Sequence, residues 1–96
     1  MELFLFARLY ARAGNAETVQ NAIHDVQGPT RAEAGCLDYH AFQSVKDIHE
    51  FYIHSRWVNQ AAFDSHVAQP HTRSFVDRVQ PLIDAPLKPV LTQRLA

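Results

Sequence analysis

The stretch that decides the fold is residues 36–58, CLDYHAFQSVKDIHEFYIHSRWV. It contains two runs rich in aromatic and β-branched residues, 36–45 and 49–58, on either side of the short polar link Lys46–Asp47–Ile48. Two such runs joined by about three to five residues predict a β-hairpin. Side chains of the second run alternate between the faces of a strand, with Phe51, Ile53, Ser55 and Trp57 on one face and Tyr52, His54, Arg56 and Val58 on the other.

Residues 3–11, LFLFARLYA, predict a further strand ahead of the hairpin. A helix is the competing interpretation, but the aromatic content and the break at Gly14–Asn15 favour a strand. Neither face of this strand is properly polar, since one carries Leu3, Leu5, Ala7 and Leu9 and the other Phe4, Phe6, Arg8 and Tyr10. The strand therefore needs cover on both sides.

A helix is expected between this strand and the hairpin. Asn15 is suited to cap its start, and apolar residues recur at the spacing of one helical face at Val19, Ala22, Ile23 and Val26. The Gly28–Pro29 step is expected to kink or split this helix, because proline gives no amide hydrogen to the preceding turn. A short helical segment through Arg31 and Glu33 should follow and end at Gly35.

A second helix is expected after the hairpin, in two pieces. Asn59 can cap the first piece, and Pro70 begins the second as a first-turn proline. The buried faces of the two pieces are expected to carry Ala62, Phe63, His66 and Val67, then Phe75, Val76, Val79 and Ile83. Residues 84–86 break the chain, and Leu87–Leu95 predict a final strand with Pro89 at its beginning or on an edge.

The predicted order is β-α-β-β-α-β with the second helix broken at Pro70, an α+β, ferredoxin-like arrangement with an antiparallel sheet. The 96 residues are expected to form one domain, 1–96. In this arrangement both helices cover the same face of the sheet, so the other face needs a partner. The simplest cover is an identical sheet in a two-fold homodimer, which would bury Phe4, Phe6, Tyr10 and Phe42.

Composition argues against several classes of partner. The net charge is −1 and the nine Lys and Arg form no basic run, so nucleic-acid binding by phosphate neutralisation is not expected. Single-stranded RNA bound on the aromatic sheet face is a weaker alternative. No stretch approaches the roughly 20 apolar residues that span a bilayer. Cys36 is the only cysteine, so no intrachain disulfide can form and a reducing, cytoplasmic location is expected.

Three stretches carry a family resemblance, TRAEAGCLDYHAF at 30–42, FYIHSRW at 51–57 and NQAAFDSHVAQPHTRSF at 59–75. They resemble the antibiotic biosynthesis monooxygenase family in the features Gly35–Cys36, Tyr39, Arg56–Trp57, Phe63, His66 and Pro70–His71. The resemblance implies a dimeric α/β barrel with a cavity between the sheet and the helices of each subunit. It also implies oxygen chemistry that many members perform without metal or flavin. Members often carry an acidic residue where this chain has Ser55, so no carboxylate role is carried over to that position.

His66 and His71 are the candidate catalytic residues. His66 shares a helical face with Phe63 and should point toward the cavity, where a neutral imidazole could remove a phenolic proton. The alternative is structural, with His66 satisfied in the core and His71 packed at the proline break. The candidate substrate-binding residues are Tyr39, Ile53, Ser55, Trp57, Phe63 and Phe75, although aromatic residues also dominate ordinary cores.

No metal or other cofactor is expected. His66 and His71 are five residues apart across a proline, unlike the i, i+4 pair of many helical metal sites, and no cysteine or carboxylate cluster completes a ligand set. Cys36 is expected to be a small buried residue rather than a nucleophile. The haem-degrading members of the resembled family use asparagine, tryptophan and histidine at positions that hold Ala7, His66 and Val76 here, which disfavours haem.

These observations favour a cofactor-independent monooxygenase that oxidises a small aromatic or quinol-like substrate with molecular oxygen. The alternative is a non-catalytic dimeric domain that binds or senses a small apolar ligand, which needs the cavity but not the histidine. His40 and His54 have the opposite strand parity to Tyr39 and Trp57 and should face the dimer interface or its rim. No role is assigned to the two remaining histidines, His24 and His49.

Overall fold

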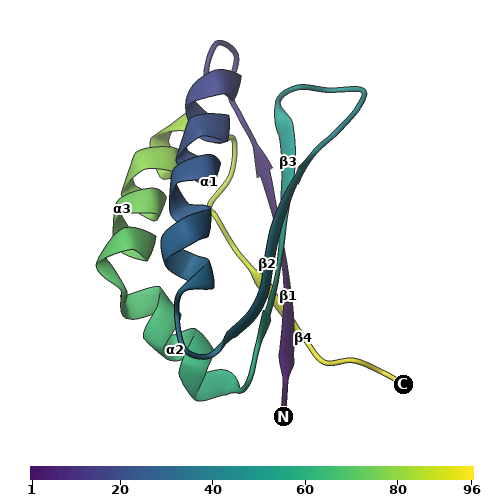
Figure 1. Cartoon of the computed structure of the whole chain (residues 1–96). Coiled ribbons are helices and arrows are strands. Elements are labelled where there is room, and N and C mark those ends of the chain that lie inside the picture. The colour runs from purple at the N-terminus through teal and green to yellow at the C-terminus, as the bar shows by residue number, and fades with distance from the viewer.

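The computed structural model describes all residues, 1–96. Four strands form one antiparallel sheet in the order β2-β3-β1-β4, with β1 at Leu3–Tyr10, β2 at Cys36–Gln43, β3 at Glu50–Trp57 and β4 at Val90–Thr92. The helices α1 (Ala16–Arg31), α2 (Gln60–Ala68) and α3 (Pro70–Val79) lie on one side of this sheet (Figure 1), and the short 3-10 helix η1 (Gln80–Leu82) follows α3. The predicted ferredoxin-like order is therefore confirmed.

The two central strands alternate as their sequences predict. Leu5 and Leu9 on β1 are buried, and the same face of β3 buries Phe51, Ile53, Ser55 and Trp57. β1 lies between β3 and β4, with Leu5 opposite Ser55 on one side and Leu91 on the other. These inward side chains form the floor on which the helices pack.

The three helices cover this floor unequally. α1 and α3 each bury a stripe of side chains, Val19, Ala22, Ile23, Val26 and Thr30 on α1 and Thr72, Phe75 and Val79 on α3. In contrast, His66 is the only residue of α2 that is buried. α2 is therefore attached to the rest of the molecule through few side chains, and one of them is polar.

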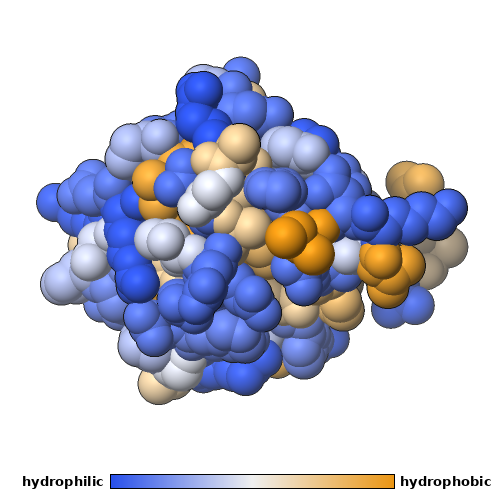
Figure 2. All heavy atoms as spheres, turned by 90° about the horizontal axis from the view of Figure 1, so that it is seen from above, coloured by the Kyte–Doolittle hydropathy of each residue, from blue (hydrophilic) through white to orange (hydrophobic).

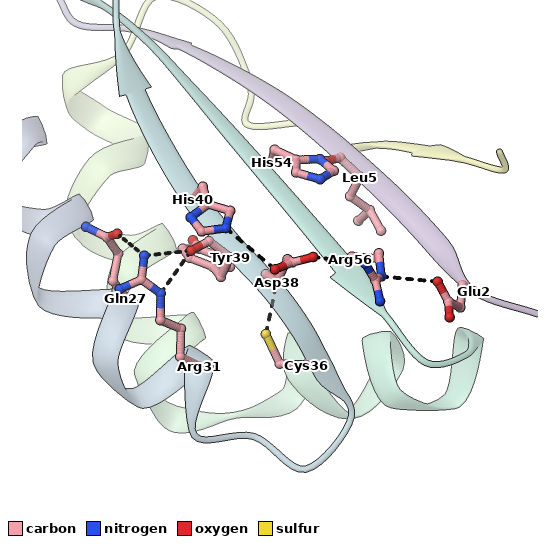
Figure 3. A network of polar contacts seen from close by, with 10 residues as sticks. All are labelled: Glu2, Leu5, Gln27, Arg31, Cys36, Asp38, Tyr39, His40, His54 and Arg56. Atoms are coloured by element: carbon pink, nitrogen blue, oxygen red, sulfur yellow. Dashed lines mark hydrogen bonds and ion pairs between the residues drawn. The ribbon is translucent and has the colours of Figure 1, made fainter.

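The expected split of the first helix at Gly28–Pro29 is wrong, because α1 runs without interruption to Arg31. Pro29 lies in the last turn, where its missing amide removes only one hydrogen bond of the helix. The turn is held from outside, since the Arg31 guanidinium donates to the backbone oxygen of Tyr39 through Nε at 2.9 Å and Nη2 at 2.8 Å (Figure 3). Consequently Glu33 lies beyond the helix and not in a further helical segment.

The second helix breaks at Pro70 as predicted. Gln69 separates α2 from α3 in an extended conformation, φ −68° and ψ 143°, the backbone region that a residue before proline prefers. Asn59 caps α2, because its side-chain oxygen accepts a hydrogen bond from the backbone amide of Ala62 at 2.9 Å. Asn15 occupies the N-cap position of α1 as predicted, but its side chain makes no capping hydrogen bond.

Two strand boundaries differ from expectation. The last strand is shorter than the predicted Leu87–Leu95, since only Val90–Thr92 pairs with β1. Pro89, which has no amide hydrogen to donate, stands directly before β4, and β4 is an edge strand as expected. The hairpin loop is also longer than the predicted three-residue link, because β2 ends at Gln43 and β3 begins at Glu50.

The sheet face away from the helices is only partly covered by its own chain. Phe6 and Phe42 expose 52% and 57% of their surface, whereas Phe4 packs beneath the Arg56 guanidinium and Tyr10 donates to the Asp47 carboxylate at 2.6 Å. Tyr52 and Val90 add to the exposed apolar surface. Seen from above, the surface is mostly hydrophilic, with separate hydrophobic patches among the polar residues (Figure 2). No partner chain accompanies this face, and the homodimer stays a prediction.

The close approach of Gly35 to α2 provides a test of the packing. A Cβ atom at Gly35 would lie 2.3 Å from the Ala62 Cβ, whereas one at Gly28 would meet nothing within 4 Å. We expect Gly35→Ala to lower the free energy of unfolding by about 1–3 kcal/mol through overpacking. Gly28→Ala is the matched control and should change it by less than about 1 kcal/mol. Urea unfolding of both variants measures the difference, and equal effects would contradict the packing described.

Candidate active site

His66 of α2 points inward and sits among aromatic rings. Its ring centroid is 4.5 Å from that of Trp57, 6.0 Å from that of Phe63 and 6.4 Å from that of Tyr39. The predicted shared face of His66 and Phe63 is therefore present. The Trp57 indole is itself fully buried and donates from Nε1 to the Ser55 hydroxyl at 3.0 Å, so β3 fixes the ring nearest to His66.

Glu33 connects the two histidines. Its Oε2 atom lies 2.7 Å from Nδ1 of His66 and 2.8 Å from Nε2 of His71. The side chains of Glu33 and His66 are each 11% exposed and that of His71 is 23% exposed. The Thr72 hydroxyl lies a little farther from the His66 Nδ1, at 3.3 Å. We call Glu33, His66 and His71 the Glu33 triad.

From the sequence we expect no carboxylate beside His66 and His71. The Glu33 triad corrects this expectation, because the Glu33 carboxylate contacts both histidines. The three side chains offer ligand atoms within 4.8 Å of one another, as a metal site would require. The contacts of 2.7 and 2.8 Å are hydrogen-bond distances, whereas ligands at 2.0–2.1 Å from a tetrahedral zinc ion lie roughly 3.3 Å apart. The observed geometry therefore fits shared protons better than a shared cation.

His66 has one ring nitrogen left for chemistry. Nδ1 contacts Glu33 and Thr72, while Nε2 has no hydrogen-bond partner in the protein. Nε2 is not among the unpaired polar atoms that are fully buried, so it is accessible. His66 also lines a cavity between the sheet and the helices. Nε2 is thus the nitrogen that a molecule in this cavity can reach.

The cavity has a volume of about 710 Å³, within the range of small-molecule sites. Twelve of its 19 lining residues are hydrophobic. The polar side chains that line it are those of Tyr39, Ser55, His66 and Thr72, together with the ionisable groups of Asp64, Arg73 and Asp77. The full lining is Leu5, Ala7, Val26, Tyr39, Ile53, Ser55, Phe63, Asp64, His66, Val67, Ala68, Thr72, Arg73, Phe75, Val76, Asp77, Leu87, Pro89 and Leu91.

Six of the eight candidate site residues line this cavity, namely Tyr39, Ile53, Ser55, Phe63, His66 and Phe75. The other two do not. Trp57 lies behind the lining, where it supports His66 and Ser55. His71 instead lines a smaller pocket of about 140 Å³ between α1 and α3, together with Asp25 and Arg78. Direct contact of Trp57 or His71 with a molecule in the main cavity is therefore not supported.

Sequence reasoning missed Glu33 and Thr72 as members of the site. Glu33 was expected in a helical segment, and its partners lie 33 and 38 residues further along the chain, so no local periodicity points to them. Thr72 follows His71 directly, and its burial at the cavity wall follows from the position of α3. The only available signal for Glu33 was its place two residues before Gly35 in the resembled motif.

Burial determines the ionisation of two further groups. It raises the pKa of the Tyr39 phenol well above its ordinary value, with nearby Cys36 and Glu33 adding to the effect. The Tyr39 hydroxyl therefore stays protonated and neutral. Burial, then Glu33 and Asp38, also raises the pKa of the Cys36 thiol, which opposes a nucleophilic role for this cysteine.

The sequence profile of the family described as antibiotic biosynthesis monooxygenase matches residues 3–78. The chain belongs to this family. It is similar to PA3566 from Pseudomonas aeruginosa, whose crystal structure superimposes with a TM-score of 0.91 at 34% identity over 99% of this chain and 95% of that one. Membership supports a monooxygenase-like function, and the site described above lies where the family resemblance placed a cavity.

Two further proteins are similar to this chain in sequence. YcnE of Bacillus subtilis, named as a candidate monooxygenase, is 33% identical over 64 residues, or 67% of each chain. The Synechocystis protein sll1783 is 31% identical over 58 residues, 60% of this chain, and the match spans only 40% of that relative's length. None of the helices here is long and apolar enough to cross a membrane.

The raised pKa of Tyr39 makes stability depend on pH. The phenol ionises near pH 10 in the unfolded chain but stays neutral in the folded one, so its contribution is complete below pH 10 and is lost as the pH rises further. We expect the free energy of unfolding to fall less steeply above pH 10 in Tyr39→Phe than in the wild type. Urea unfolding between pH 8 and about pH 11 measures this, with the exposed Tyr52→Phe as control. Equal slopes would show that Tyr39 is not buried.

Proposed function

We propose that this protein is a cofactor-independent monooxygenase that oxidises a small aromatic, quinol-like substrate with molecular oxygen. The observation that carries the proposal is the unpaired Nε2 of a buried histidine on the wall of an apolar cavity of about 710 Å³. His66 is the catalytic base in this proposal. Tyr39, Ile53, Ser55, Phe63 and Phe75 form the substrate-binding wall.

The proposed reaction begins with a proton transfer. His66 Nε2 takes the phenolic proton of the substrate, and the electron-rich anion gives one electron to oxygen. The resulting substrate radical and superoxide combine at a carbon that carries hydrogen, and His66 returns its proton to form a hydroperoxide. Loss of water leaves one oxygen atom in the substrate as a carbonyl. The substrate supplies all the electrons, so no external reductant is required.

The surroundings of His66 suit these steps. A substrate that fills this largely apolar cavity displaces water from it, which strengthens electrostatic interactions with the substrate anion. The neutral Tyr39 hydroxyl has no partner within the protein and can donate to a substrate oxygen, where negative charge develops. The aromatic side chains Phe63 and Phe75 give a flat ring a surface to stack on and hold it for reaction.

We also propose that the protein is a homodimer through the sheet face that carries Phe4, Phe6, Tyr10 and Phe42. Exposed Phe6 and Phe42, with Tyr52 and Val90 beside them, form apolar surface of a kind that usually has a partner. In a two-fold dimer the same sheet of a second copy covers this face, so no different protein is needed. Arg56 ion pairs with Glu2 and Asp38 border this surface (Figure 3).

Oxygen consumption with a panel of hydroquinones and polycyclic phenols tests the activity. We expect turnover by the wild type and a loss of about 100-fold or more in His66→Ala, because a positioned general base contributes roughly 10²–10⁴-fold. His24→Ala is the matched control, since His24 is exposed on α1 and does not line the cavity. Circular dichroism establishes beforehand that both variants are folded.

Two results would count against this activity. Turnover that survives His66→Ala would remove His66 as the base. Binding of the same phenols with equal affinity by the wild type and His66→Ala, with no product from either, would support instead a domain that binds or senses an apolar ligand.

Sedimentation equilibrium tests the homodimer. We expect the wild type at twice the chain mass and Phe6→Asp at the chain mass, because the substitution places a charge in the centre of the apolar face. Val45→Asp is the control, since Val45 is fully exposed in the hairpin loop and should leave the mass unchanged. A wild type at the chain mass across micromolar concentrations would contradict the dimer.

A further inference from the structure

The Glu33 triad contains more than the proposed base requires, and its hydrogen bonds restrict where the protons lie. An ionised carboxylate oxygen can only accept hydrogen bonds. Because Glu33 Oε2 lies 2.7 Å from the His66 Nδ1 and 2.8 Å from the His71 Nε2, both nitrogens must be donors while Glu33 is ionised. Each histidine is therefore held in one tautomer.

The two tautomers are not equivalent for chemistry. A neutral imidazole carries one proton, so a proton on the His66 Nδ1 leaves a lone pair on Nε2. Nε2 is the ring nitrogen without a protein partner, on the residue that lines the main cavity. With the proton on Nε2 instead, His66 would present a donor to the substrate and could not accept a phenolic proton.

The placement of His71 explains the second bond. His71 belongs to α3 and approaches Glu33 from the side of the smaller pocket, where it neighbours Asp25 and Arg78. It contacts the same oxygen as His66 and does not reach the main cavity. Two donors from two helices fix that oxygen more firmly than one.

We propose that Glu33 is a positioning residue that keeps His66 in the tautomer with Nδ1 protonated and Nε2 free, and that His71 holds Glu33 for this purpose. The catalytic benefit of this tautomer rests on the proposed function, whereas the hydrogen bonds that select it do not. When Nε2 takes a proton, the His66 cation forms beside the Glu33 carboxylate in a site where both side chains are 11% exposed. The carboxylate therefore also stabilises the protonated base.

Nitrogen NMR of the protein labelled with ¹⁵N-histidine tests the tautomers without any substrate. In the neutral ring, protonated and unprotonated nitrogens have well-separated chemical shifts. We expect the wild-type His66 to show a protonated Nδ1 and an unprotonated Nε2, and His71 a protonated Nε2. Glu33→Gln presents an amide that both accepts and donates, so the His66 ring should become a mixture of tautomers. Glu17→Gln, an exposed position on α1, is the matched control and should match the wild type.

His71→Ala is the second variant, since it leaves Glu33 in place. It removes one of the two donors, and we expect the preference of His66 for a protonated Nδ1 to weaken without disappearing. On a substrate identified in the oxygen-consumption panel, Glu33→Gln should lower kcat by about 100-fold, within the roughly 10²–10⁴-fold range of a general base. KM should change little, because Glu33 is not part of the cavity lining.

The outcomes separate the inference from the proposed function. A wild-type His66 with its proton on Nε2, or a Glu33→Gln spectrum equal to the wild type, would overturn the inference whatever the activity. Nδ1 protonation that depends on Glu33, together with turnover that survives His66→Ala, would support the tautomer control and sink His66 as the base. A rise in KM with unchanged kcat in Glu33→Gln would contradict the inference, because it would show that Glu33 affects only how the substrate binds.

Discussion

The inner face of the sheet presents more apolar surface than α1 and α3 cover. The cavity beside His66 follows from this incomplete cover. Both helices bury regular stripes against β1 and β3, but α2 contributes His66 alone. The uncovered remainder is the cavity of about 710 Å³. A thin layer of helices on a doubly apolar sheet thus leaves one face with an internal space and the opposite face with exposed Phe6 and Phe42.

The hydrogen bonding of the two candidate histidines depends on a single carboxylate. Glu33 lies in the segment between α1 and β2, yet it contacts His66 on α2 and His71 on α3. A buried carboxylate is costly unless it is hydrogen-bonded, and two donors satisfy Glu33 Oε2. The same bonds link the segment after α1 to α2 and α3, so Glu33 Oε2 contributes both to the proposed chemistry and to the packing of the helices.

Much of the fold was predictable from sequence, because it depends on local patterns. Alternation along β3 placed Ser55 on the buried face, and the proline rule placed the break at Pro70. The expected split at Gly28–Pro29 failed because Arg31 binds a backbone oxygen of β2, a contact that helix propensity does not describe. Glu33 was missed for a similar reason, since its two partners are brought together only by the tertiary fold. No local sequence pattern predicts the substrate, because residues from several helices and strands together determine the shape of the cavity.

The single buried side chain of α2 has a consequence for how the site can change. His66 both lines the cavity and anchors its helix, through the tilted indole of Trp57 and the Glu33 carboxylate. Any replacement removes a reactive nitrogen and at the same time leaves Glu33 with one donor fewer. Loss of reactivity and loss of folding stability are thus coupled at this position. The exposed positions of α2 have neither role. We expect substitutions there to leave both His66 and the folding stability largely unchanged.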